Sequence, residues 1–144
     1  MANAVMNTFK YDTLAAALAA ATDLRIALLK DTYTPNVDTT EDWDDVSAHE
    51  CDATGYTQYG ESLANEAITK DTSNDRAYLD ADDVTWNPFT GTARYGVVYD
   101  KNAGASSTWK VWGIIDFGGN ITATGGAFTV TFAAPGSGGV LYLS

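Results

Sequence analysis

The pattern of apolar and polar positions predicts a chain built mostly of β-strands. In residues 93–100, Tyr95, Val97 and Tyr99 fall on one side of an extended segment, and Gly96 and Val98 fall on the other. Both faces of this segment are therefore largely apolar, which is typical of a central strand that is covered on both sides.

Other segments share this alternation, or are apolar runs bounded by turn residues. They predict strands at residues 24–30, 63–70, 76–80, 109–117, 128–132 and 140–143. Residues 71–75 are rich in turn formers and predict a β-hairpin, and further turns are expected at Asn87-Pro88 and at residues 118–120. Seven to nine strands without a parallel βαβ rhythm indicate an all-β protein made of an antiparallel β-sandwich.

The N-terminal part of the chain follows a different pattern. Residues 1–10 carry little periodicity and are expected to form a flexible arm. Leu14, Leu18 and Ala21 then recur at helical spacing, which predicts one short helix over residues 11–21. Its apolar stretch is too short to span a bilayer, so we expect a soluble protein that is made without export. Residues 11–144 are expected to form a single domain.

A long acidic connection is expected at residues 37–54. One helical turn is predicted near residues 41–45, capped by Thr39 or Thr40. Connections of this length inside a compact domain are usually functional or mobile.

The formal net charge is −11, and the acidic residues are unevenly distributed. Of the 19 acidic residues, 15 fall between Asp31 and Asp83, where Lys70 and Arg76 are the only basic residues. Because binding to nucleic acid needs clustered Lys and Arg, nucleic acid is not expected as a partner. The acidic surface can serve solubility, or it can orient the protein on a partner.

Candidate metal ligands are few. Cys51 and His49 each occur once, so no internal disulfide is possible and the pair falls short of a protein zinc site. Asp80, Asp82 and Asp83 could coordinate Ca²⁺, but the run does not fit an EF-hand loop, and a solvated strand end is the simpler interpretation. A second acidic group around Trp43 is interpreted in the same way. We predict no cofactor and no metal.

Catalytic motifs are also missing from the sequence. No G-x-S-x-G elbow accompanies His49, and the Gly-Gly pairs lack the Lys and the following helix of a phosphate-binding loop. Pairs of carboxylates are so abundant that they do not indicate a glycosidase. The sequence therefore predicts that the protein is not an enzyme.

Several short strings occur in the same order in one group of proteins. They are Tyr33-Thr34-Pro35-Asn36, Asp44-Asp45-Val46, Thr54-Gly55-Tyr56, Asp80-Ala81-Asp82-Asp83-Val84-Thr85-Trp86, Ala93-Arg94-Tyr95 with Tyr99-Asp100, and the Gly-Ile-Ile-Asp-Phe-Gly string that begins at Gly113. Over about residues 24–132 the chain resembles small structural proteins of tailed bacteriophages, and especially the capsid decoration or cement proteins on the outside of icosahedral heads.

This resemblance implies a β-sandwich of jelly-roll character and a homodimer or homotrimer. It also implies binding to the major capsid protein at the joints between its subunits. The protein would be made in the host cytoplasm and would be located on the outer surface of the virion. No membrane, nucleic acid or cofactor is expected as a partner. Edge strands, the N-terminal arm and the acidic connection are candidate contact segments. The contact candidates are Ala2, Asn3, Val5, Phe9 and Trp43.

A second interpretation places the chain elsewhere in the virion. A tail- or fibre-associated module could bind a host surface glycan through exposed Trp and Tyr side chains. The number of copies in the virion distinguishes the two interpretations.

Overall fold

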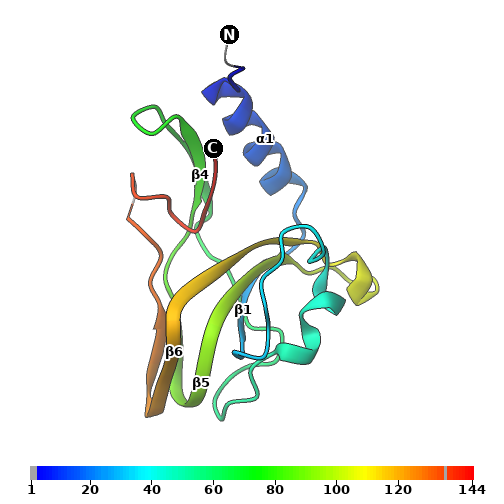
Figure 1. The fold of residues 1–144 in the computed structure, drawn as a ribbon, viewed down its shortest axis with the longest axis vertical. Coiled ribbons are helices and arrows are strands. Elements are labelled where there is room, and N and C mark those ends of the chain that lie inside the picture. The colour runs from blue at the N-terminus through cyan, green and yellow to red at the C-terminus, as the bar shows by residue number, and fades with distance from the viewer. Residues whose placement is uncertain (1–2, 135) are drawn as a thin grey trace. The chain divides into compact units, whose positions relative to one another are not determined.

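The computed structural model describes residues 3–134 and 136–144 of the chain. It contains two antiparallel sheets and one α-helix (Figure 1), which confirms the prediction of a mostly β protein with a short N-terminal helix. The contacts between residues divide the chain into two compact units. Unit 1 takes its described residues from Met1–Ala21, Ala64–Asp83 and Thr131–Ser144, and unit 2 consists of Thr22–Leu63 and Val84–Val130. The expectation of one domain over residues 11–144 stays a prediction.

Unit 2 is built on a four-stranded sheet in the order β2-β1-β5-β6. The bounds of its strands are β1 Leu24–Leu29, β2 Glu61–Ser62, β5 Val84–Asp100 and β6 Val111–Val130. Strand β5 lies between β1 and β6, and Val97, Val98 and Tyr99 have no exposed area. The segment expected to form a central, doubly covered strand does so.

One face of this sheet carries an aromatic core. Its buried members come from β1, β5 and the connections on either side of them: Ala27, Leu29, Tyr33, Trp43, Val46, Val97, Tyr99 and Trp109. The rings of Trp43 and Tyr99 have centroids 4.4 Å apart. Large aromatic side chains bury much area per residue, so this cluster is a main source of stability for the sheet.

The acidic connection packs against this core through two short 3₁₀ helices. They span Trp43–Asp45 and Ser47–His49. The cap of the first helix is Asp42, whose carboxylate accepts from the backbone N–H of Asp44, while the Asp45 carboxylate accepts from the N–H of Asp42 in return. The predicted turn is present, but it is capped by Asp42 and not by Thr39 or Thr40.

Strands β5 and β6 form a long curved ladder in which both strands bend together (Figure 1). The turn predicted at residues 118–120 lies inside β6. There the register jumps from the pair Tyr95 and Asp116 to the pair Ala93 and Ile121, so the extra residues form a bulge and the chain does not reverse. Asn87-Pro88 likewise interrupts the register within β5 and does not end the strand.

Unit 1 combines helix α1 with a three-stranded sheet in the order β3-β4-β7. The bounds are α1 Asn7–Ala20, β3 Ala67–Asp71, β4 Arg76–Asp80 and β7 Leu141–Leu143. Strands β3 and β4 pair as the predicted hairpin. The helix begins four residues earlier than expected, so residues 7–10 of the expected arm are its first turn.

Candidate contact surfaces

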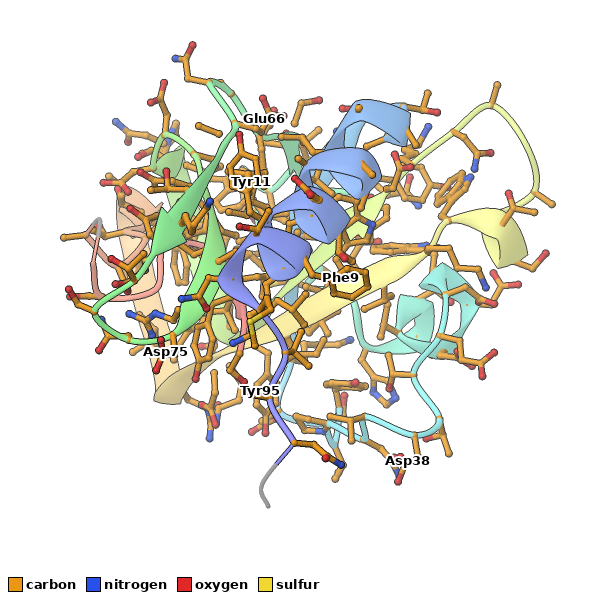
Figure 2. The ribbon with its side chains drawn as sticks, turned by 90° about the horizontal axis from the view of Figure 1, so that it is seen from above. Phe9, Tyr11, Asp38, Glu66, Asp75 and Tyr95 are labelled. Carbon is orange, nitrogen blue, oxygen red and sulfur yellow. The ribbon has the colours of Figure 1, made fainter. Side chains whose placement is uncertain are left out.

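A cluster of exposed apolar side chains lies where the chain enters α1. Val5, Met6 and Phe9 are 54%, 63% and 65% exposed. Figure 2 shows Phe9 on the side of α1 that points away from β3 and β4, whereas Tyr11 lies on the side of these strands. Large apolar side chains that gather on a surface usually mark a contact site. We call Val5, Met6 and Phe9 the N-terminal patch.

The rest of the outer face of α1 is also nearly uncharged. Its exposed residues beyond the patch are Asp12, Thr13, Ala16, Ala17, Ala19 and Ala20, of which only Asp12 carries a charge, whereas Thr8 lies toward β3 and accepts from Lys70. Alanine side chains allow close approach of another surface. The N-terminal patch therefore continues into a smooth helix face.

Lys10 is the buried anchor of this end of the helix. It is 6% exposed, and its ammonium donates to the backbone carbonyl of Asp75 and to Asn7 Oδ1, the latter at 3.4 Å. Asn7 in turn donates to the Asp75 carboxylate. These bonds fix the first turn of α1 on the β3–β4 hairpin and so hold the N-terminal patch in place.

The structure accounts for the expected contact residues in different ways. Asn3, Val5 and Phe9 are exposed, as a contact role requires, whereas Ala2 lies outside the described residues. Trp43 is 2% exposed and packs on Tyr99, so its ring is part of the core and is not available to a partner. Met6 belongs to the same surface but was not among the expected residues, although its place between Val5 and Phe9 was a usable signal.

Unit 2 carries an open apolar pocket of about 420 Å³. Its walls come from the start of the acidic connection and from the first part of β6: Pro35, Asn36, Val37, Thr40, Val111, Trp112, Gly113, Ile114 and Asp116. Val37 is 98% exposed at its rim. Asp116 forms an ion pair with Arg94, and the hydrogen bond from Arg94 is the main reason why the pKa of Asp116 lies below its usual range.

A third surface is the ladder between residues 84–93 of β5 and residues 117–130 of β6. None of these 24 residues is charged, in a chain with 27 charged residues. Three cross-strand pairs on this ladder join exposed threonines: Thr85 with Thr129, Thr90 with Thr124, and Thr92 with Thr122. We call this region the neutral ladder.

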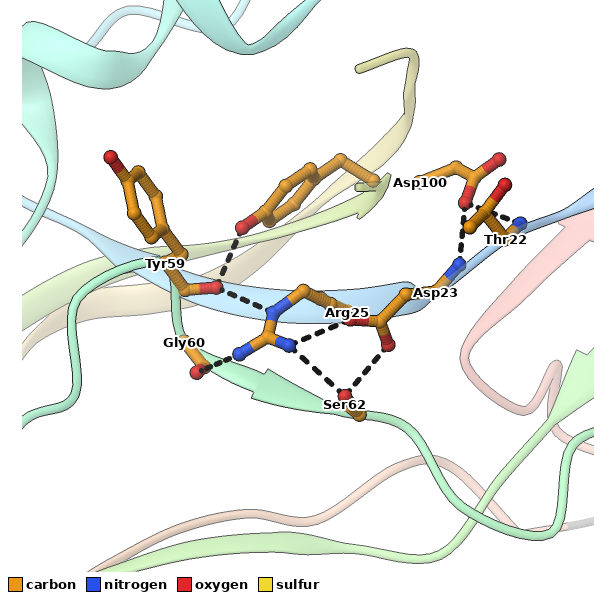
Figure 3. Close-up of polar contacts among 8 residues, drawn as sticks. Thr22, Asp23, Arg25, Tyr59, Gly60, Ser62 and Asp100 are labelled. Atoms are coloured by element: carbon orange, nitrogen blue, oxygen red, sulfur yellow. Dashed lines mark hydrogen bonds and ion pairs between the residues drawn. The ribbon is translucent and has the colours of Figure 1, made fainter. Parts of the chain in front are cut away.

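The most connected polar cluster is built around Arg25 at the start of β1 (Figure 3). Its guanidinium donates to Asp23 Oδ2 at 2.8 Å, to the carbonyl of Gly60 at 2.7 Å and to the carbonyl of Tyr59 at 3.1 Å. Burial raises the pKa of Asp23, but the hydrogen bonds from Ser62 and Arg25 lower it more, so the carboxyl is a stronger acid than usual. The bonds from Arg25 to the carbonyls of Tyr59 and Gly60, and the bond from the Ser62 hydroxyl to Asp23, join β1 to the β2 region.

Glu50 is a partly buried carboxyl with aromatic neighbours. Its Oε1 accepts from the hydroxyl of Tyr56 at 2.9 Å and from the backbone N–H of Tyr59 at 2.6 Å. Burial raises its pKa more than these two bonds lower it. The Tyr56 hydroxyl also accepts from the N–H of Leu28, so Glu50 holds the connection against β1.

His49 and Cys51 have separate environments. His49 Nδ1 lies 2.8 Å from the hydroxyl of Thr32, and the Cys51 thiol donates to the carbonyl of Thr92. Cys51 is buried, and this burial raises the pKa of its thiol, which makes it a poor nucleophile. The two side chains therefore do not form a nucleophile and base pair.

Each carboxylate of the Asp80–Asp83 run has a different protein partner. Asp80 accepts from the N–H of Ala81, Asp82 from the side chain of Asn65, and Asp83 from the N–H of Phe132. Within residues 3–134 and 136–144, no group of three or more His, Cys, Asp or Glu side chains is placed to hold a metal ion. The described helices also include none that is long and apolar enough to cross a membrane.

Comparisons of the chain with protein-family models, with curated proteins and with solved structures found no match.

Proposed function

We propose that the chain is a non-enzymatic structural protein of a tailed-bacteriophage virion, a decoration or cement protein. It would bind the outside of the icosahedral head at joints between major capsid protein subunits and stabilise the shell. The single observation that carries this proposal is the N-terminal patch, because a strongly anionic chain keeps large apolar side chains exposed there. The resemblance of the short strings to phage decoration proteins supplies the class of partner.

The architecture supports the proposal further. A cement protein needs a rigid body that presents a contact surface, and the Lys10 bonds hold the patch on the β3–β4 hairpin. Two antiparallel sheets and the long β5–β6 hairpin are compatible with a sandwich of jelly-roll character, which we propose as the finer description of the fold. Acidic residues elsewhere on the chain suit a surface that faces solvent and stays away from packaged DNA.

The alternative of a glycan-binding tail module finds less support. Trp43, Trp86 and Trp109 are 2%, 3% and 7% exposed, so three of the four tryptophans are core residues. Trp112 in the pocket of unit 2 is the exception. Three of the four tryptophans are therefore not accessible to a glycan, whereas Tyr142 is 58% exposed.

The first test is the number of copies in the virion that carries the chain. Quantitative mass spectrometry of gradient-purified virions should find hundreds of copies in a fixed ratio to the major capsid subunit. A handful of copies would favour the tail module, and complete absence would overturn both.

The second test asks whether the N-terminal patch makes the contact. We expect a Val5→Ser/Phe9→Gln variant to bind heads that lack the protein at least about tenfold more weakly, because apolar anchors dominate interface energies. Tyr142→Gln is the matched control, since it removes another large exposed side chain, from β7, that belongs to none of the candidate contact surfaces. Equal binding by both variants and the unmodified protein would refute the role of the patch.

A further inference from the structure

The outer side of β6 is a long sheet edge with little of the usual protection. Exposed edges are normally short, charged, covered or twisted away by β-bulges, and of these β6 has only its irregular, glycine-containing parts. The other edges follow this rule: β2 and β7 have two and three residues, and β3 carries Lys70 and Asp71. Strand β6 has 20 residues, and the bond from the N–H of Val111 to the carbonyl of Glu41 covers only its beginning.

The charge distribution points to the same stretch. Residues 117–130 of β6 and residues 84–93 of its neighbour carry no charge. Two carboxylates reach them, where Asp31 accepts from the Asn120 side chain and Asp116 from the N–H of Gly118. Two copies of a chain with net charge −11 repel each other over most of their surfaces. The neutral ladder is a surface on which they can approach without placing like charges opposite each other.

The sequence of this edge is complementary to itself. When two identical strands pair antiparallel about a two-fold axis, one residue must lie opposite its own copy, because opposite residues share a face of the sheet. With Thr122 at this position, Gly118 lies opposite Gly126 and Gly119 opposite Gly125 of the second copy. Each irregular, glycine-containing part of β6 then lies opposite the other such part of the second copy. Small residues therefore face small residues.

We propose that two copies of this chain associate by antiparallel pairing of their β6 edges, with Thr122 opposite Thr122 of the second copy. The two four-stranded sheets then join into one. The existing pair of Thr92 and Thr122, whose hydroxyl oxygens are 2.8 Å apart, extends into a row of four threonines. Cross-strand threonine pairs of this kind stabilise sheets.

This association goes beyond binding to the capsid and does not depend on it. It is tested on the purified full chain without any head or virion. Failure of capsid binding would leave it standing, and its failure would leave the proposed function standing.

The first experiment is sedimentation equilibrium of the full chain. We expect a monomer–dimer equilibrium, and we expect Thr122→Lys to weaken the dimer at least about tenfold, because two ammonium groups would face each other across the axis. Thr69→Lys on the β3 edge is the control and should leave the dimer unchanged; circular dichroism checks the fold of both variants. A monomeric or trimeric wild-type chain, or equal effects of the two substitutions, would overturn the proposal.

The second experiment tests the register. Opposite residues in an antiparallel pair have Cα atoms about 4.5–5.5 Å apart, which is within the range for a disulfide. Mild oxidation should therefore link Thr122→Cys into a covalent dimer, whereas Thr69→Cys and the wild-type chain with its buried Cys51 should stay largely unlinked. Equal linking of the two variants would contradict the two-fold axis at Thr122.

Discussion

The hydroxyl of Tyr99 donates to the backbone carbonyl of Tyr59 at 2.6 Å, and this links the end of β5 to the chain just before β2. Tyr99 has no exposed area, so its hydroxyl has no access to water in the folded state. The same carbonyl also accepts from Arg25, which leaves it satisfied if the tyrosine hydroxyl is lost.

Replacing this hydroxyl tests the value of the bond. We expect Tyr99→Phe to lower the free energy of unfolding by about 1 kcal/mol, measured by urea denaturation, because the ring still fills the core and one hydrogen bond is lost. Tyr142→Phe is the control at a site that is 58% exposed, and its effect should stay within about 0.5 kcal/mol. Equal stability of Tyr99→Phe and wild type would show that the bond contributes nothing.

Glu50 should make stability depend on pH. Its pKa is higher in the folded state than in the unfolded chain, so its favourable contribution is complete below the unfolded value and is lost as the pH rises through the folded value. Both of its hydrogen bonds fall on Oε1, which the carbonyl oxygen of glutamine can replace.

We therefore expect Glu50→Gln to be more stable than wild type at neutral pH, and the advantage to shrink as the pH falls below the folded pKa. Urea denaturation of both proteins between about pH 4 and pH 8 measures the difference, in which the other titrating groups cancel. An advantage that is constant or grows toward low pH would contradict this assignment.

Substitution of Trp43 tests whether this side chain stabilises the core or lies on a contact surface. We expect Trp43→Ala to lower the free energy of unfolding by about 3–5 kcal/mol, because it leaves a cavity beside Tyr99. Val37→Ala, at a side chain that is 98% exposed, should change stability by less than about 0.5 kcal/mol. An unchanged free energy of unfolding in Trp43→Ala would contradict the core role of Trp43.

The regular strands could be predicted from the sequence because their residues are apolar on both faces or alternate cleanly. The centre of β5 is buried on both faces, and Phe128 and Val130 are buried on either side of the exposed Thr129. The turn formers at 71–75 likewise join β3 to β4. In these segments local preference and tertiary packing agree.

The turns predicted at residues 118–120 and at Asn87-Pro88 were wrong, because glycine and proline occur both in turns and in irregular parts of strands. A glycine at a positive φ angle fits a turn and a bulge equally well, and Gly118 and Gly125 both adopt this conformation inside β6. The choice between them depends on whether β5 continues alongside. Nothing within the local sequence of residues 118–120 contains that information.

The burial of Trp43 was not predicted, for a different reason. Its acidic neighbours indicated a solvated loop, but Asp44 and Asp45 are exposed while Trp43 and Val46 are buried. Because a 3₁₀ helix has three residues per turn, the spacing of Trp43 and Val46 places them on one side. That spacing was the available signal, and the run of carboxylates obscured it.

The division into units has a consequence for the order of events during synthesis. Every segment of unit 2 has been made once Val130 leaves the ribosome, whereas β4 still lacks its neighbour β7 at that moment. Unit 1 must therefore wait for β7, and its sheet closes through contacts that are distant in sequence, which is a slow step in folding. Neither unit is one continuous stretch of the chain, so no single cut of the gene would yield either of them alone.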